Sequence, residues 1–557
     1  MRLRRERVEN AESVKSVESV TCIFLLLLVL GLTISVNAQE TPNQIMPYSY
    51  QFYQKLNPEV YSPETRFHSS IRGYFSDDPL LQEKYYNLMN ENVDLRVRRS
   101  WLRRKLTDEH LLNAHGDDYD FYADLLPDGQ IGKEFKDGTQ TWLNSRGAQA
   151  GGSVGDQFSF YMNFFENQSV FSNYMTRFID KNQVVPSELR GRLEPDKRIK
   201  DWTYVTALLS YTPIEHLNIA LGYDKNFIGD GYRSMLLSDN AANYTFLRLR
   251  ANLGNVTYQT IFAYMLDPGA EKLTEVRSLG DRAKWAAIHY LDWNATERFS
   301  FGFFQAVTWA DAYPEGKRGF DFNYIHPLIF LRPLEGANTT SPDKMRIGFN
   351  AKYEVAENTA VYGQFMFDEF TAKEFFSGSG YWANKSAIQL GVRGSNLLHI
   401  DKLNYLLEFN TARPYTYAHY NRVSNYAQMN QSLAHPLGAN FREFVSLLNY
   451  SFGRFDFQAQ ALYAFYGTDP EGFNYGGDIF KDYNTHVNKY GNFVGQGIAT
   501  KLYFGEVRAA YVINPKYNLR VELSGIYRNE KSAVTNLQTN LITIGLRSSF
   551  RNLYRDF

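Results

Sequence analysis

The feature that most constrains the fold is an alternation of apolar and polar residues with a period of two, which begins near Asp120 and continues to the C-terminus. Residues 344–355 show it clearly: the odd positions are Met345, Ile347, Phe349, Ala351, Tyr353 and Val355, and the even positions are Lys344, Arg346, Gly348, Asn350, Lys352 and Glu354. Successive side chains of a strand point to opposite faces. We therefore predict strands with one face toward an apolar phase and the other toward water.

The connections between these strands alternate in length. Short turns occur at 151–155, 212–215, 253–255, 293–297, 355–358, 396–401, 451–454 and 514–516, and long aromatic-rich segments separate them. Short turns on one side and long loops on the other are typical of a transmembrane β-barrel. Two strands for each turn plus a C-terminal strand give seventeen, and single-chain bacterial barrels have even counts. Residues 120–131 therefore supply a first strand, and we predict an all-β antiparallel barrel of about eighteen strands over residues 120–557.

The N-terminus has the pattern of a secretory signal. An apolar run at 23–32 follows several basic residues and precedes Val36-Asn37-Ala38. We predict a signal peptide over residues 1–38. Cys22 lies before the apolar run, which argues against a lipoprotein, and the mature chain then has no cysteine for a disulfide or a thiolate site. Export combined with a barrel predicts the bacterial outer membrane, with its lipid as the surrounding phase.

Residues 39–119 are expected to form a periplasmic, partly helical segment. Its clearest helical signal is a leucine- and arginine-rich stretch over residues 92–112. A solvated basic face is one reading of this stretch, and contact with lipid phosphates or an acidic partner is the other. At the opposite end, the last alternating segment runs toward Phe557. A terminal strand that ends in an aromatic residue resembles the assembly signal of outer-membrane barrels, so the barrel assembly machinery is an expected partner.

Composition excludes two classes of protein. Removal of residues 1–38 leaves 59 − 5 = 54 basic and 60 − 4 = 56 acidic residues, a formal balance of −2. A nucleic-acid binder would need a strong basic excess. The chain is 16% aromatic and 21% charged, and it has no further apolar run of about 18 residues, as a helical membrane protein would need.

No catalytic or metal motif stands out. The ten histidines form no HExxH pattern, so we expect neither a metal nor another cofactor. His419 and Ser424 share one loop, but no GxSxG elbow or acidic partner accompanies them. The loop 469–482 carries four carboxylates without EF-hand spacing, so a solvated loop is favoured over a calcium site. We therefore predict that the protein is not an enzyme.

Three segments could contact a ligand. Gly229 and Gly231 permit a tight turn that would hold Asp230 and Arg233 close together, either as an internal ion pair or as ligand contacts. The apolar run 325–331 is expected to fold back into the barrel mouth, as a plug or as the floor of a ligand site.

The third segment is the loop 411–442, which combines aromatic rings with guanidinium groups. Such rings pack on sugar C–H surfaces, and arginine binds carboxylates in a bidentate manner. The likeliest contacts with an acidic surface polysaccharide are Arg413, Tyr415, Tyr417 and Arg422. The alternative for the rings is a membrane-interface girdle.

Several long strings carry a family resemblance: RFHSSIRGYF (66–75), FIGDGYRSMLLSD (227–239), IHPLIFLRPLEGANTTSPD (325–343), TARPYTYAHYNR (411–422), NQSLAHPLGANFREF (430–444) and AYVINPKYNLRVEL (510–523). With these the sequence resembles the Wzi-type capsule-assembly family of outer-membrane proteins, and within it the RemB-like gliding-motility branch. The resemblance implies an eighteen-stranded barrel with a periplasmic helical segment. It also implies a non-enzymatic, lectin-like role in fastening polysaccharide to the cell surface.

Three functions are compatible with these features of the sequence. The leading one is a barrel that binds or anchors surface polysaccharide, for capsule or exopolysaccharide assembly or for adhesion linked to gliding. A passive porin or uptake channel is the second, and an outer-membrane hydrolase the third. Lumen permeability separates the first two, because a plugged barrel passes no small sugars.

Overall fold

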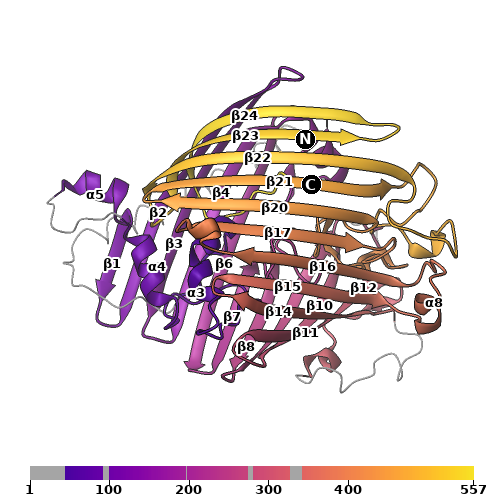
Figure 1. Ribbon diagram of the computed structural model, residues 1–557, viewed down its shortest axis with the longest axis horizontal. Helices are drawn as coiled ribbons and strands as arrows, with labels where there is room; N and C mark the ends of the chain where they lie inside the picture. Colours follow the sequence, from indigo (N-terminus) through magenta and orange to yellow (C-terminus); the bar gives the residue numbers. More distant parts are fainter. Residues whose placement is uncertain (1–43, 92–98, 196, 274–279, 327–341) are drawn as a thin grey trace, which may run out of the picture.

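The computed structural model describes residues 44–91, 99–195, 197–273, 280–326 and 342–557, which form a closed antiparallel β-barrel (Figure 1). Its main sheet has twenty strands, of which β1 (Leu112–Gly116) and β5 (Gly191–Arg192) are short additions at the edges of β2 and β6. The remaining eighteen strands form the wall, so the predicted fold class is confirmed. They are β2 (Tyr119–Glu134), β3 (Gln140–Val154), β4 (Phe158–Val170), β6 (Lys200–Ile214), β7 (Leu217–Asp224), β8 (Tyr244–Asn252), β9 (Val256–Asp267), β10 (Arg282–Asn294), β11 (Phe299–Ala310), β14 (Lys344–Ala356), β15 (Thr359–Glu369), β16 (Lys385–Gly394), β17 (Leu403–Ala412), β20 (Phe441–Phe452), β21 (Phe455–Thr468), β22 (Ile498–Asn514), β23 (Leu519–Lys531) and β24 (Asn536–Ser548).

The first and last strands of the wall close the barrel. β2 pairs with β24 from Gly129 opposite Leu546 to Glu134 opposite Leu541. The first strand predicted at 120–131 is therefore present, slightly longer than expected. Short turns lie at one end of the barrel and long loops at the other, and in outer-membrane barrels the long loops are extracellular. We name the two ends accordingly.

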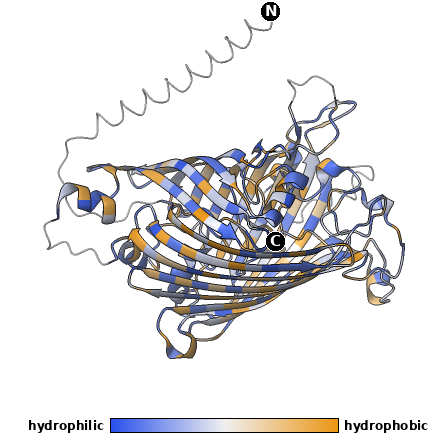
Figure 2. Ribbon diagram, turned by 90° about the horizontal axis from the view of Figure 1, so that it is seen from above, coloured by the Kyte–Doolittle hydropathy of each residue, from blue (hydrophilic) through white to orange (hydrophobic). Residues whose placement is uncertain are grey.

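Alternating stripes of apolar and polar residues run along the strands (Figure 2). In β14 the odd residues face outward and the even residues face the lumen: Tyr353 is 46% exposed, whereas Arg346 is fully buried and pairs with Asp368 at 3.0 Å. Lys352 is buried as well and pairs with Glu354 at 3.0 Å. The register predicted for this strand is confirmed. No helix among the described residues is long and apolar enough to cross a membrane.

The helical segment expected before the barrel lies against the inner wall at the short-turn end. It comprises α2 (Tyr50–Tyr53), η1 (Gln54–Leu56), α3 (Asn57–Val60) and α4 (Gln82–Met89). Asn404 of β17 donates to the Gln54 carbonyl at 2.8 Å, and Arg393 of β16 donates to the Asn57 side chain at 2.6 Å. Lys55 pairs with Asp456 of β21 at 2.8 Å. Residues 44–91 therefore fill this end of the lumen.

The basic helix predicted over 92–112 is shorter in the structure. Its described part is α5 (Trp101–Thr107), and residues 92–98 lie outside the described residues. The helix lies at the short-turn end beside β22, where Asn514 donates to the Lys105 carbonyl at 3.1 Å. The chain then enters β1 at Leu112, where it pairs with β2 and can no longer be helical.

The C-terminus corrects a prediction. The last strand ends at Ser548 and does not reach Phe557, and residues 549–557 turn back into the lumen. Their charged side chains find buried partners there: Arg551 pairs with Glu188 at 3.1 Å, and Asp556 pairs with Arg233 at 3.0 Å. Phe557 packs against Phe178 of α6 (Asn173–Asn182), which lies in the loop between β4 and β6. The terminal aromatic residue belongs to the filling of the lumen and not to the wall.

The register of β14 can be tested at Ile347, which faces outward. We expect Ile347→Arg to reduce the amount of assembled barrel, because an arginine near the bilayer midplane costs about 2–4 kcal/mol. Ile347→Leu is the matched control and should assemble normally, as judged by heat-modifiable migration of membrane fractions. Asn350→Arg is no neutral comparison, because Asn350 donates to Asp230 in the lumen at 3.0 Å. Normal assembly of Ile347→Arg would contradict the register.

Deletion of residues 551–557 tests the position of the tail. Since the wall keeps all its strands, the truncated protein should still insert and show heat-modifiable migration. The ion pairs of Arg551 and Asp556 disappear, so the melting temperature should fall by several degrees. Arg551→Gln combined with Asp556→Asn, in the full-length chain, should reproduce the destabilisation. If the truncated protein is exported but does not assemble, the tail is instead part of the wall.

Candidate binding site at the extracellular mouth

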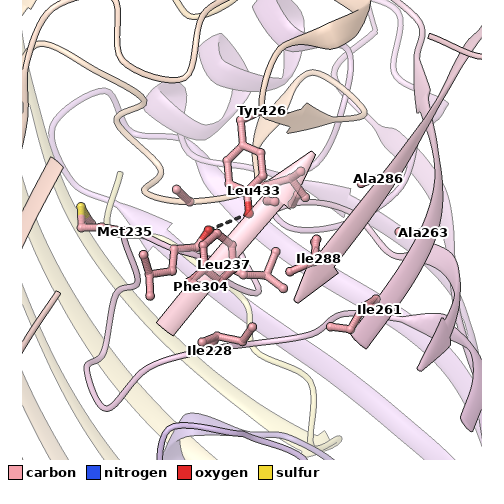
Figure 3. Packing of buried hydrophobic residues seen from close by; sticks show 14 of the residues in the cluster. Ile228, Met235, Leu237, Ile261, Ala263, Ala286, Ile288, Phe304, Tyr426 and Leu433 are labelled. Carbon is pink, nitrogen blue, oxygen red and sulfur yellow. Dashed lines mark hydrogen bonds between the residues drawn. The ribbon is translucent and has the colours of Figure 1, made fainter. Parts of the chain in front are cut away.

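Two long loops fold down into the barrel from its extracellular end. The loop 225–243, between β7 and β8, and the loop 413–440, between β17 and β20, pack on each other and on the inner faces of β9, β10 and β11 (Figure 3). The Tyr426 hydroxyl donates to the Leu236 carbonyl at 2.7 Å, and the Tyr417 hydroxyl donates to the Met235 carbonyl at 2.8 Å. These contacts make the two loops one buried unit inside the mouth.

The predicted ligand contacts Asp230 and Arg233 both lie in this buried unit. Asp230 accepts hydrogen bonds from Ser69 at 2.6 Å and from Asn350 at 3.0 Å. Arg233 forms ion pairs with Glu443 at 3.3 Å and with Asp556 at 3.0 Å. The turn therefore does not hold the predicted ion pair between the two residues, because each has its own partners. A buried charge needs such partners to offset its loss of hydration.

The side chains of the four residues predicted in the loop 411–442 contact different parts of the barrel. The rings of Tyr415 and Tyr417 are 1% and 0% exposed, and the Tyr415 hydroxyl donates to the Asn474 carbonyl at 2.9 Å. Arg413 donates to the Asn384 carbonyl at 2.8 Å. Arg422 pairs with Asp267 at 3.3 Å. These side chains hold the loop in its fold, and its free surface lies elsewhere.

Residues of three loops form an aromatic platform at the mouth, in which two rings are exposed and four are half-buried. The loop 370–384 supplies two rings, the loop 413–440 supplies one, and the loop 469–497 supplies three. The platform residues are Tyr381, Trp382, Tyr420, Tyr483, His486 and Tyr490.

The platform rings contact each other in a continuous series. Trp382 stacks on His486 at 4.3 Å with an interplanar angle of 13°, and Tyr381 lies 5.5 Å from Tyr490. Tyr420 and Tyr490, at the two ends of the series, are 44% and 47% exposed. Exposed rings at fixed spacing offer rigid apolar faces with polar edges, which is the surface that sugar rings require.

A cation supports the platform from below. Lys385, the first residue of β16, places its Nζ 3.5 Å from the ring centroid of Tyr483 and 4.9 Å from that of Trp382. The same ammonium group pairs with Glu369 at 2.6 Å. Burial raises the pKa of the Tyr483 phenol, so this ring stays neutral at neutral pH. The cation–π contacts fix the rings before any ligand arrives.

Of the three loops that build the platform, only one was predicted from the sequence to contact a ligand. Trp382, Tyr483 and Tyr490 were missed, although the loops 370–384 and 469–497 are rich in aromatic residues. Among the carboxylates considered for calcium in the loop 469–482, Asp469 accepts from the Tyr475 amide at 2.8 Å and pairs with Lys481 at 3.0 Å. No group of possible metal ligands is found among the described residues.

His419 and Ser424 do not form a catalytic pair. In the described residues no hydrogen bond joins them, and His419 Nδ1 instead contacts the backbone of Asn421 at 3.2 Å. Burial lowers the pKa of His419 to about 3, with Lys344 and Arg346 acting in the same direction. The apolar run 325–331, which was expected to fold into the mouth, lies largely outside the described residues.

Comparison with known proteins supports the fold. No family model and no curated protein sequence matches the chain. Among solved structures, the chain is similar to Wzi of Escherichia coli, an outer-membrane protein described as a carbohydrate-binding β-barrel involved in group 1 capsule assembly. The identity is 13%, the match covers 91% of this chain and 100% of that one, and the TM-score is 0.51.

More distant likenesses are to OprD of Pseudomonas aeruginosa and to OccAB2 of Acinetobacter baumannii. The OprD match has 10% identity, covers 76% of this chain and 94% of that one, and has a TM-score of 0.41. The OccAB2 match has 7% identity, covers 77% and 97%, and has a TM-score of 0.43. The closed wall and the similarity to Wzi together define the class as an eighteen-stranded barrel of the outer-membrane type, with the Wzi-like fold expected from the sequence. Membership of the RemB-like branch stays a prediction.

Proposed function

We propose that the protein is a non-enzymatic outer-membrane barrel that binds surface polysaccharide at its extracellular mouth. The observation that carries this proposal is the aromatic platform, because three separate loops bring its rings together and leave Tyr420 and Tyr490 exposed at its ends. The similarity in fold to a carbohydrate-binding barrel supports it. Such a surface would serve to retain capsule or exopolysaccharide, or to adhere during gliding.

The contents of the lumen favour a binding protein over a passive porin. An eighteen-stranded wall encloses a lumen wide enough for water. Here the N-terminal segment, the loop 225–243 and the C-terminal tail meet inside it: Tyr61 donates to Asp230 at 3.3 Å, and Tyr232 donates to Asp556 at 2.8 Å. These contacts between distant parts of the chain cross the space that a permeating solute would need.

The platform also carries a charge suited to acidic sugars. Lys489 is exposed, with its Nζ 5.6 Å from the ring centroid of Tyr490. A uronic acid stacked on that ring would bring its carboxylate near this ammonium group. Such an exposed pair is screened by salt, with a Debye length of about 8 Å at physiological ionic strength. Binding to an acidic polysaccharide should therefore weaken as salt is raised.

The platform is tested by replacing its two exposed ends, Tyr420 and Tyr490, with alanine. We expect weaker retention of labelled native polysaccharide on cells, by about 1–3 kcal/mol in binding free energy if each ring packs on one sugar. Phe135→Ala is the matched control, because Phe135 is an exposed ring in the loop between β2 and β3, outside the platform. All variants are compared at equal amounts in the outer membrane. Equal retention by the double variant and the parent would remove the platform as the site.

Permeability tests the alternative of a porin. Purified parent protein in liposomes should allow no swelling in small sugars, because the N-terminal segment, the loop 225–243 and the C-terminal tail meet across the lumen. Deletion of residues 44–91, which removes the N-terminal filling, is the positive control and should increase permeability. If the parent allows swelling at the rate of an open porin, the barrel is a channel.

A further inference from the structure

The outer surface of the wall carries three unpaired cations in one row. Four neighbouring strands of the wall carry it, β20, β21, β22 and β23 (Figure 1). Arg442 of β20 is paired with Phe465 of β21, which is paired with Lys501 of β22, which is paired in turn with Lys531 of β23. All three cations are exposed, whereas the adjoining Glu443 is buried in the lumen, so the row faces outward. The row lies at the extracellular end, next to the long loops 413–440 and 469–497. We call Arg442, Lys501 and Lys531 the cation row.

The cation row has no negative partner within the part of the chain that the structure describes. No ion pair involves Arg442, Lys501 or Lys531, whereas inward-facing cations such as Arg346, Lys352 and Arg547 are paired with carboxylates. Lys501 and Lys531 are directly opposite each other, and like charges in that position destabilise an antiparallel pair. Neighbouring strands are about 4.8 Å apart, so the three charges lie within about 15 Å. An anion bound between them would remove the repulsion.

An aromatic row lies directly below the cations on the same outer surface. It is formed by paired residues of adjacent strands, Phe409, Phe444, Tyr463 and Tyr503. On each strand the aromatic residue is two positions further from the extracellular loops than the residue at the level of the cation row, which on β17 is Thr411 and on β21 is Phe465. Girdles of aromatic residues mark the boundary between the hydrocarbon and the headgroups. The cation row therefore lies at the level of the lipid headgroups.

Below the aromatic rings the wall is hollowed. The hollow has a volume of about 830 Å³, and Tyr463, Tyr503 and Tyr527 form its sides. Its floor consists of three small residues that pair across three strands, Ser446, Ala461 and Gly505. A second hollow of about 480 Å³ lies further toward the short-turn end, over Ala459, Ala509 and Gly525. We call these two apolar hollows, the first of which begins beneath the cations, the recessed track.

The small floor residues are not required by packing within the chain. A Cβ built on Gly505 would meet only the Gln460 carbonyl, at 3.9 Å, and one built on Gly525 would meet only Val507, at 3.6 Å. Glycine inside a strand lowers stability relative to a larger residue. Its presence twice on an exposed apolar face indicates that the recess accommodates something outside the chain.

We propose that this surface binds a phosphate-bearing, multiply acylated glycolipid of the outer leaflet. The cation row holds its phosphate groups, and the recessed track holds an acyl chain. Lysine and arginine are the usual donors to phosphate, and an apolar recess at the depth of the hydrocarbon fits an alkyl chain. The site requires a barrel that spans the outer membrane with its long loops outward. It does not depend on polysaccharide binding at the platform.

The experiment measures binding of bis-phosphorylated lipid A to the purified full-length barrel in detergent by native mass spectrometry. Neutralising the row with Arg442→Gln, Lys501→Gln and Lys531→Gln together should weaken binding at least tenfold. Gly505→Leu should also weaken it, by filling the track, and the open space above Gly505 lets this variant fold. Lys133→Gln, which removes an exposed lysine of β2 outside the row, is the matched control and should bind as the parent does.

Two further lipids separate the parts of the proposal. Dephosphorylated lipid A should bind the parent weakly. It should bind the neutralised variant with the same affinity as the parent. Phosphatidylglycerol should bind more weakly than lipid A, because it has one phosphate and two acyl chains. The proposal is overturned if the neutralised variant and Gly505→Leu both bind bis-phosphorylated lipid A as tightly as the parent does. It is also overturned if the parent binds dephosphorylated lipid A or phosphatidylglycerol equally well.

Discussion

Every part of this structure depends on the requirement that backbone N–H and C=O groups be hydrogen-bonded where no water is available. In a bilayer a sheet meets that requirement only when it closes on itself. Closure is made here by one short ladder, six residues of β2 paired with six of β24. The outward apolar face, the inward polar face and the separation of short turns from long loops follow once the sheet is closed. The apolar composition of the outer face and the polar composition of the inner face therefore both depend on the pairing of β2 with β24.

Closure creates a second problem, because eighteen strands enclose more space than their own inward side chains fill. The chain fills the space with charged and aromatic groups from segments far apart in sequence. Arg233 is paired with Glu443 of β20 and with Asp556 of the tail, and Asp230 binds Ser69 of the N-terminal segment. Removing one partner of such a buried pair leaves an uncompensated charge, which is far more costly than the pair is stabilising. The filling is therefore cooperative, and its pieces hold one another in the lumen.

Much of the wall could be predicted from sequence because a strand reports its environment at every second residue. The alternation in 344–355 specified the outward and inward faces of β14, and the parity rule placed the first strand close to where β2 begins. The tail and the mouth could not be predicted in this way. The sequence of residues 549–557 looks like a continuation of β24, but these residues lie in the lumen. Their positions depend on partners such as Glu188 and Arg233, which are hundreds of residues away in the sequence. Tyr415 and Tyr417 have the composition of a ligand surface, but whether a loop ring faces solvent or the lumen depends on packing between loops.

The inward course of the C-terminus brings the two described ends of the chain together. The Tyr50 amide donates to the side chain of Asn552 at 3.1 Å, and the rings of Phe52 and Phe550 lie 5.6 Å apart. A fusion at the C-terminus would place its first residues in a crowded, charged interior and not in free solvent. Reporter domains and affinity tags are better inserted at the turn 532–535 between β23 and β24, where Val534 is 72% exposed and the chain already leaves the wall. The geometry of the tail thus decides how the protein can be labelled on living cells without disturbing its interior.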